Sequence, residues 1–136
     1  MVQILSRILT QSHVDHRSTI GGGVKITHSF GLIVGSKAVL GKNVTLTQGV
    51  TIGGNFWKTN MEGRTMPIIG DNVFIGHHSS ILGPIRIGSH VVIAPHTVIT
   101  NDLKGNACYA GNPVQQILPK NKIITKTIRG IYLNDV

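Results

Sequence analysis

The amino-acid sequence predicts an all-β fold, a parallel β-helix in which short strands stack as successive coils. The main observation is a strict six-residue period, with an isoleucine at Ile69, Ile75, Ile81, Ile87, Ile93 and Ile99. Neither an α-helix nor an alternating strand has this spacing, whereas β-helix solenoids do. The composition agrees, because 17 glycines can supply tight corners and an aromatic content of only 4% leaves Ile, Val and Leu to build the core.

The six-residue register continues upstream in two phases. The first phase places aliphatic residues at Ile8, Val14, Ile20, Ile26 and Leu32. After a two-residue slip, a second phase runs through Val34, Leu40, Leu46 and Ile52. Three hexapeptides form one triangular coil, so roughly eighty periodic residues predict four to five coils. We expect a single domain that covers residues 1–136.

Two segments depart from the register. Residues 53–68, GGNFWKTNMEGRTMPI, are expected to form a protruding loop, and loops of this length without their own secondary structure are usually functional. Residues 103–136 are expected to form a C-terminal cap. A strand or short helix there would cover the apolar face that the last coil of a solenoid otherwise exposes.

Charge and composition narrow the choice of partners. Thirteen Lys and Arg against five Asp and Glu give a formal charge of +8, which suits an anionic ligand such as nucleic acid, an acidic glycan or a phosphorylated cofactor, or a basic surface with no single purpose. Without zinc-finger spacing or an aromatic-studded basic strand, we expect no nucleic-acid binding. One cysteine and no signal-like segment predict a cytoplasmic protein, and no apolar run reaches the roughly 18 residues of a membrane span.

Seven histidines raise the question of a metal site. Such a site needs three ligands on one face. His90 and His96 stand at equivalent positions of successive hexapeptides, which places them on different walls, and strand alternation directs His77 and His78 to opposite sides. We therefore expect no metal.

Four segments resemble known sequences in the correct order. They are IGGGVKITHSFGLIVG, LGKNVTLTQGVTIGG, PIIGDNVFIGHHSSILGPIRIG and AGNPVQQI. They resemble the histidine segment, the two coils around the extended loop and the closing turn of the serine O-acetyltransferases and the related sugar O-acetyltransferases of polysaccharide synthesis. The resemblance covers residues 20–117. It implies a left-handed β-helix that forms homotrimers with active sites between subunits, and acetyl transfer from acetyl-CoA to a hydroxyl group.

The resemblance places catalytic roles on this chain. His28 falls on the family's general base, and an imidazole with a pKa near ~6.5 is mostly neutral at pH 7 and able to accept a proton. Gly54 falls where a backbone amide meets the thioester, as an oxyanion donor would. The serine enzymes orient their histidine with an aspartate fifteen residues earlier, where this chain has His13. Asp15 would share the side-chain direction of His13 in an extended segment, so it is our candidate to orient His28; His13 and a backbone carbonyl are the alternatives.

The resemblance also implies where the cofactor arm lies. The small corner residues and the closing turn that match are Gly76, Ser79, Ala94, Thr97, Gly111, Asn112 and Pro113. Lys120 and Lys122 are assigned to the cofactor phosphates from charge and location alone, and a solvated basic tail explains them as well.

The acceptor side differs from the serine enzymes. They hold the amino acid with an Arg-His pair just before a proline, whereas Thr65 and Met66 precede Pro67 here and Arg64 stands one residue further away. Their long amino-terminal helical domain also has no counterpart in the sequence. We therefore expect the acceptor to be a sugar of a surface polysaccharide or its precursor, bound by Arg64, Met66 and Trp57, with the Trp57 indole stacked on the ring or packed on a neighbouring subunit. L-serine is the alternative acceptor, and a non-enzymatic β-helix scaffold is the competing class of function.

Overall fold

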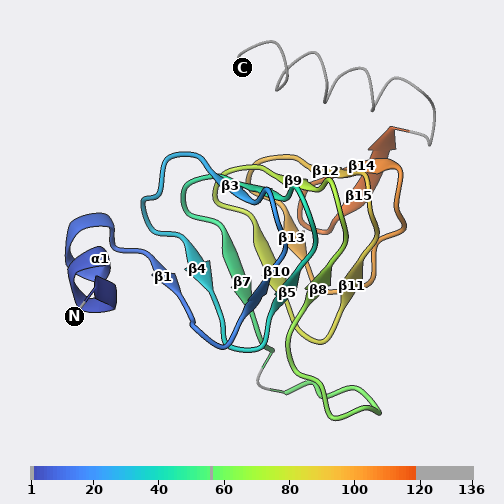
Figure 1. The fold of residues 1–136 in the computed structure, drawn as a ribbon. Coiled ribbons are helices and arrows are strands. Elements are labelled where there is room, and N and C mark those ends of the chain that lie inside the picture. Colours follow the sequence, from blue (N-terminus) through green and yellow to red (C-terminus); the bar gives the residue numbers. More distant parts are fainter. Residues whose placement is uncertain (1, 56, 119–136) are drawn as a thin grey trace.

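The chain winds into a three-walled prism of short parallel strands (Figure 1). The computed structural model describes residues 2–55 and 57–118. The first wall contains β1 (His13–Val14), β4 (Ile33–Val34), β7 (Thr51–Gly53), β10 (Ser80–Leu82) and β13 (Val98–Ile99). The second wall contains β2 (Thr19–Ile20), β5 (Val39–Leu40), β8 (Ile68–Ile69) and β11 (Arg86–Ile87). The third contains β3 (Lys25–Ile26), β6 (Thr45–Leu46), β9 (Phe74–Ile75), β12 (Val91–Ile93), β14 (Ala107–Ala110) and β15 (Gln115–Leu118).

Strand register follows the six-residue period. Ile81 pairs with Ile52 and Ile99 in the first wall, and Ile75 pairs with Leu46 and Ile93 in the third. The side chains of this ladder fill the prism and are fully buried. The parallel β-helix predicted by the repeat is therefore confirmed, with the aliphatic ladder as its core.

The three corners between the walls differ in character. We call the corner between the third and first walls the His28 corner; it consists of residues 27–32, 47–50, 76–79 and 94–97. The corner between the first and second walls carries the protruding loop and is called the loop corner. The corner between the second and third walls carries Gly21, Gly41, Gly70, Gly88 and Gly105. A Cβ on Gly88 would lie 2.3 Å from the Gly105 nitrogen, so at this corner only glycine lets successive coils approach.

The first coil is less buried than the rest. Ile20 and Ile26 occupy interior positions but are 44% and 47% exposed, whereas their partners one coil later are 1% exposed. Before this coil the chain forms the helix α1 (Val2–Thr10), not the strand that the register predicted at Ile8. That prediction is wrong because the apolar residues there recur at helical spacing. They are Ile4, Leu5, Ile8 and Leu9, and all four are exposed.

The opposite end of the prism is covered. β14 adds to the third wall in parallel, and β15 turns back on β14 in antiparallel fashion. The side chains of Leu103, Ala107 and Tyr109 are buried against the last coil, as a cap requires. The remainder of the predicted cap, residues 119–136, lies outside the described residues. No helix in the described part of the chain is long and apolar enough to cross a membrane.

Candidate active site

His28 lies on an enlarged corner of the prism. Between β3 and β4 this corner has residues 27–32, two more than residues 47–50 of the next coil, and the register slip of the sequence is located here. His28 has a φ of 56°, in the left-handed region where non-glycine residues are uncommon. Its carbonyl accepts a hydrogen bond from the Phe30 amide at 2.9 Å, which closes the turn and leaves the His28 side chain exposed. The imidazole is thus presented to the outside, in a position to meet a substrate.

Three further histidines gather on the same corner in later coils. The ring centroids of His77, His78 and His96 are 5.1–5.6 Å apart, and the His78 and His96 rings are stacked. The prediction that His77 and His78 point to opposite sides is therefore wrong, because strand alternation does not hold at a corner where His78 has a φ of 56°. Among the described residues no group of three His, Cys, Asp or Glu side chains is arranged to hold a metal ion.

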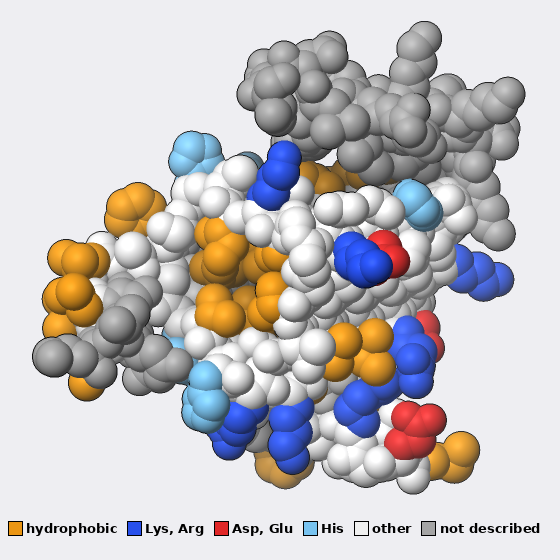
Figure 2. Space-filling view, viewed as in Figure 1, with side chains coloured by type: hydrophobic (Ala, Val, Ile, Leu, Met, Phe, Trp, Pro, Cys, Tyr) orange, Lys and Arg blue, Asp and Glu red, His pale blue; other side chains and the backbone are white. Residues whose placement is uncertain are grey.

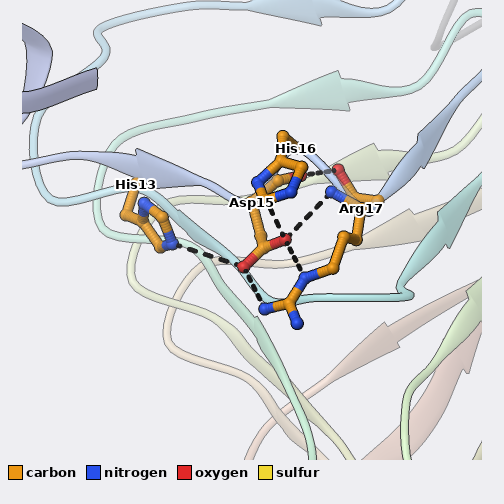
Figure 3. A network of polar contacts seen from close by, with 5 residues as sticks. His13, Asp15, His16 and Arg17 are labelled. Carbon is orange, nitrogen blue, oxygen red and sulfur yellow. Dashed lines mark hydrogen bonds and ion pairs between the residues drawn. The ribbon is translucent and has the colours of Figure 1, made fainter. Parts of the chain in front are cut away.

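Asp15 lies on a different corner from His28. It follows β1 on the loop corner, and Arg17 grips both carboxylate oxygens, with Nε 3.0 Å from Oδ1 and Nη2 2.9 Å from Oδ2 (Figure 3). The Arg17 amide adds a hydrogen bond to Oδ1 at 2.9 Å. These hydrogen bonds from Arg17 hold the pKa of the Asp15 carboxyl far below its usual value. Within one chain Asp15 therefore does not contact His28 directly, contrary to the predicted role.

Two histidines flank the same carboxylate. His13 Nε2 lies 3.8 Å from Asp15 Oδ2, and His16 Nδ1 lies 3.8 Å from Oδ1. The His13 side chain is 29% exposed, whereas that of His16 is 73% exposed. His13 stands at the start of β1, next to the His28 corner, so it is the member of this network nearest to His28 along the fold.

Gly54 begins the protruding loop directly after β7. No hydrogen bond from its amide to another described residue is found, which leaves this N–H available to a ligand. Met66, at the other end of the loop, packs beside it, since a Cβ on Gly54 would lie 3.2 Å from the Met66 sulfur. Met66 is only 8% exposed and belongs to the core. The prediction that Met66 binds the acceptor is therefore corrected: its side chain anchors the base of the loop.

Arg64 and Trp57 occupy different environments on the loop. Arg64 is half-buried, and its Nη2 donates to the Pro84 carbonyl at 3.2 Å. Its Nε is buried and has no hydrogen-bond partner among the described residues. Trp57 is 94% exposed, so it contributes nothing to the core of this chain. The loop thus offers one partly satisfied guanidinium and one unpacked indole.

Two of the predicted cofactor-binding residues have side chains that are buried inside the prism. Ser79 and Thr97 are 0% exposed, and both hydroxyls donate to the Ala94 carbonyl, at 2.9 and 2.7 Å. These two side chains therefore serve the fold and are not available to a cofactor. Glycine is also required at Gly76, because a Cβ added there would lie 2.5 Å from the Pro95 nitrogen.

The closing turn lies beyond the last coil. Gly111, Asn112 and Pro113 are exposed between β14 and β15, and the Gly111 carbonyl accepts from the Val98 amide at 3.3 Å. Lys120 and Lys122, the predicted phosphate contacts, lie outside the described residues. An open groove of about 550 Å³ is found elsewhere, on the glycine-rich corner beside Arg86 and Lys104, and so does not include His28.

Cys108 is the other nucleophilic side chain to consider. It is a free cysteine on β14, 8% exposed, and burial raises the pKa of its thiol. A buried thiol with a raised pKa is a poor nucleophile. A covalent acetyl-cysteine is therefore not supported by this site.

Comparison with known proteins finds similarity to hexapeptide-repeat transferases. Residues 66–101 match the family described as bacterial transferase hexapeptide (six repeats). The chain is 35% identical over 127 residues to a serine acetyltransferase of Staphylococcus epidermidis, covering 93% of this chain and 58% of that protein. It is 36% identical over 112 residues to the serine acetyltransferase of Mycobacterium tuberculosis, covering 82% and 48%. The chain thus spans about half the length of the curated relatives it matches.

Solved structures of serine acetyltransferases are also similar to this chain. The crystal structure of the serine acetyltransferase of Neisseria gonorrhoeae superposes with a TM-score of 0.80 at 31% identity, over 89% of this chain and 45% of that one. A serine acetyltransferase of Brucella abortus in complex with coenzyme A superposes with a TM-score of 0.76 at 32% identity, over 88% and 47%. These proteins are named for serine as acceptor. The prediction of a polysaccharide sugar as the favoured acceptor is therefore wrong, and the alternative, serine, is the better supported one.

Proposed function

We propose that this chain, which belongs to the bacterial hexapeptide-repeat transferase family, is an acetyl-CoA-dependent O-acetyltransferase that acts on the hydroxyl of L-serine. The observation that carries the proposal is the exposed His28 imidazole on its enlarged corner, in a fold shared with serine acetyltransferases at 31% identity. The departure of Thr65 and Met66 from the Arg-His pair of the serine enzymes changes how serine is held.

In the proposed reaction His28 acts as general base. Its unprotonated nitrogen accepts the proton of the serine hydroxyl while the hydroxyl oxygen attacks the thioester carbonyl of acetyl-CoA. The new carbon–oxygen bond forms, the carbon–sulfur bond then breaks, and the imidazolium returns the proton to the coenzyme A thiolate. Positioned proton transfer of this kind contributes about 10²–10⁴ in rate.

The Gly54 amide is the proposed oxyanion donor. Its N–H has no partner among the described residues, and Met66 fixes the backbone position by packing beside it. Negative charge develops on the carbonyl oxygen during attack, and one well-placed donor of this kind is worth about 10²–10³ in kcat. His28 and Gly54 lie on different corners, at opposite edges of the first wall. We therefore propose that the complete site forms between subunits of a homotrimer, which unites His28 of one copy with the loop of another.

Arg64 is the proposed partner of the serine carboxylate. Pro84 fixes one nitrogen of the guanidinium, and the buried Nε is left without a partner. A carboxylate that accepts from Nε and a neighbouring nitrogen would satisfy it in the side-by-side geometry that arginine favours. Trp57 is proposed to cover the acceptor side of the site, because an indole 94% exposed in one chain can be buried by a ligand or a second copy.

Acetyl-CoA is proposed to lie along the His28 corner. Ala94 and the turn Gly111–Pro113 offer small residues against which an extended arm can pack, whereas Gly76 is buried. The formal charge of +8 favours the phosphorylated end of the cofactor, and Lys120 and Lys122 remain candidates for it.

Flat, weakly polar surface supports the proposed homotrimer. Ile33, on the outer side of the first wall, is 43% exposed, and Figure 2 shows hydrophobic side chains gathered on this face and on α1. Exposed apolar patches of this kind often mark interfaces between proteins.

The test is acetyl transfer with purified protein. Wild type should release free coenzyme A from acetyl-CoA only when L-serine is present, and mass spectrometry should identify O-acetyl-L-serine. Arg64→Ala should raise the KM for serine about 10- to 100-fold, the loss expected for a charged hydrogen bond of about 1.5–3 kcal/mol. Lys58→Ala, on the exposed part of the same loop, is the matched control and should not change KM. Absence of thiol release with serine, or release only with other hydroxyl compounds, would refute the proposed acceptor.

A further inference from the structure

The helix α1 has an apolar side that no described part of the chain covers. Ile4, Leu5, Ile8 and Leu9 share one side of the helix, because residues three and four apart are neighbours on its surface. All four are 56–70% exposed. We call these four residues the α1 strip. A strip of four large aliphatic side chains on a nine-residue helix is an unusual amount of apolar surface to leave in contact with water.

The first coil holds the C-terminal end of α1. The Gly31 amide donates to the Thr10 carbonyl at 3.1 Å, and the Ser12 amide donates to the Thr10 hydroxyl at 3.3 Å. Figure 1 shows α1 beyond β1, at the end of the prism opposite β15. Ile20 and Ile26, whose side chains fill this first coil, are also 44% and 47% exposed. The α1 strip therefore belongs to the open end of the prism, whereas β14 and β15 cover the other end.

The open end is also the more basic part of the described chain. Residues 1–52 contain five Lys and Arg and one Asp, a net charge of +4, whereas residues 53–118 contain four Lys and Arg and three Asp and Glu, a net charge of +1. The single acid, Asp15, is bound by Arg17. The lysines of residues 1–52 are all exposed, and none of them forms an ion pair with another described residue. They are Lys25, Lys37 and Lys42.

From this combination we propose that α1 lies on the surface of an anionic lipid bilayer, with the α1 strip at the boundary between head groups and acyl chains. A helix with one apolar side and basic surroundings binds membranes in this way, in the plane of the bilayer and not across it. Negative head groups attract the Lys and Arg side chains of the first two coils. Figure 2 shows hydrophobic side chains on α1 and Lys and Arg side chains along the lower edge of the same face. The inference does not depend on the proposed acetyl transfer.

Charge distinguishes a lipid surface from a second copy of this chain. Two copies that met through α1 would bring together two ends of net charge +4, and like charges oppose association. An anionic bilayer is attracted by the same charges. It also accepts aliphatic side chains without a shaped pocket, whereas the core of a protein interface must be packed as densely as a protein interior. Both properties favour lipid as the occupant of the α1 strip.

The test is co-sedimentation of the purified protein with lipid vesicles. Vesicles of equal parts phosphatidylcholine and phosphatidylglycerol should bind wild type, and vesicles of phosphatidylcholine alone should bind it much more weakly. Leu5→Gln should weaken binding about tenfold, because the buried apolar area of one side chain is lost. Ile117→Gln is the matched control and should bind as wild type does, since Ile117 on β15 is 54% exposed and Leu5 is 56% exposed. Both variants should unfold at the wild-type temperature, because both side chains are exposed.

The electrostatic part of the binding has its own pair of variants. Lys25→Gln should weaken binding to the phosphatidylglycerol vesicles about fivefold, the contribution of one basic residue near an anionic surface. Lys104→Gln, which removes an exposed lysine near the capped end, should leave binding unchanged. High salt should weaken the binding of wild type, because it screens exposed charges.

A second measurement follows the helix itself. A polarity-sensitive fluorophore attached to Leu5→Cys should shift its emission to shorter wavelength when phosphatidylglycerol vesicles are added, and the same fluorophore on Ile117→Cys should not. No binding to either kind of vesicle, equal binding to both kinds, or equal binding of Leu5→Gln and wild type would overturn the proposal. Sedimentation velocity without vesicles tests the other occupant. An oligomer that Leu5→Gln dissociates would also overturn the proposal, because a second copy would then cover the α1 strip.

Discussion

Substitution of Ser79, whose hydroxyl is buried, tests whether this residue stabilises the fold or binds the cofactor. Its Oγ donates to the Ala94 carbonyl at 2.9 Å and accepts from the Thr97 amide at 3.2 Å, at 0% exposure. Ser79→Ala removes both bonds. The Ala94 carbonyl keeps the Thr97 hydroxyl as a donor, but the Thr97 amide loses its acceptor. A buried donor left unsatisfied costs about 1–3 kcal/mol.

This loss should appear in stability and not in catalysis. We expect the free energy of unfolding of Ser79→Ala to fall by about 1–3 kcal/mol. Wild type and variant must be compared at one protein concentration, because the stability of an oligomer depends on concentration. Urea unfolding followed by circular dichroism gives the first quantity, and the KM for acetyl-CoA gives the second, which should stay unchanged. Unchanged stability together with a raised KM would contradict a structural role for the Ser79 hydroxyl, since the hydroxyl would then face the cofactor.

Three further substitutions test other parts of the structure. Asp15 has a lowered pKa in the folded state, so it stabilises the fold above its unfolded pKa of about 3.9, and this contribution is lost as pH falls through the folded value. In Asp15→Asn the free energy of unfolding should therefore depend less on pH below about pH 4 than in wild type. The same pH dependence in both proteins would contradict this. Gly88→Ala puts a Cβ 2.3 Å from the backbone of the next coil and should lower the free energy of unfolding, measured by thermal unfolding, by about 1–3 kcal/mol. Gly22→Ala, whose Cβ would have nothing within 4 Å, is the control and should not change it. Equal melting temperatures of the two variants would contradict the close approach of coils at Gly88. Trp57→Ala should change the unfolding free energy of one chain by less than about 0.5 kcal/mol, because the indole is 94% exposed, and a larger loss in urea would mean that it packs on a second copy.

The core of the fold could be predicted from the sequence because its period is unusual. Ile75, Ile81 and Ile93 repeat at a spacing that suits only a solenoid, and each is buried as expected. The register failed at Ile8, where one aliphatic residue in phase outweighed the helical spacing of its neighbours. The signal that could have corrected it was the pairing of Ile8 with Leu5 and Ile4 at three and four residues.

The site was harder to predict because its contacts cross coils and corners. Sequence alone could locate His28 at the register slip, but the capture of Asp15 by Arg17 depends on the turn that follows β1. Met66 follows polar residues in the sequence and yet is buried, because the loop folds back onto the core at that point. His77 and His96 are nineteen residues apart, and they meet because successive coils stack in register, which requires a defined number of residues per coil.

The general-base role of His28 is tested most directly by the turnover of His28→Ala with acetyl-CoA and L-serine. We expect kcat to fall by about 10²–10⁴. The affinity for coenzyme A, measured by calorimetry, should be as in wild type, and so should the oligomeric state, because the imidazole is exposed and supports no other described side chain. Turnover of His28→Ala at the wild-type rate would contradict the assignment of His28 as the general base.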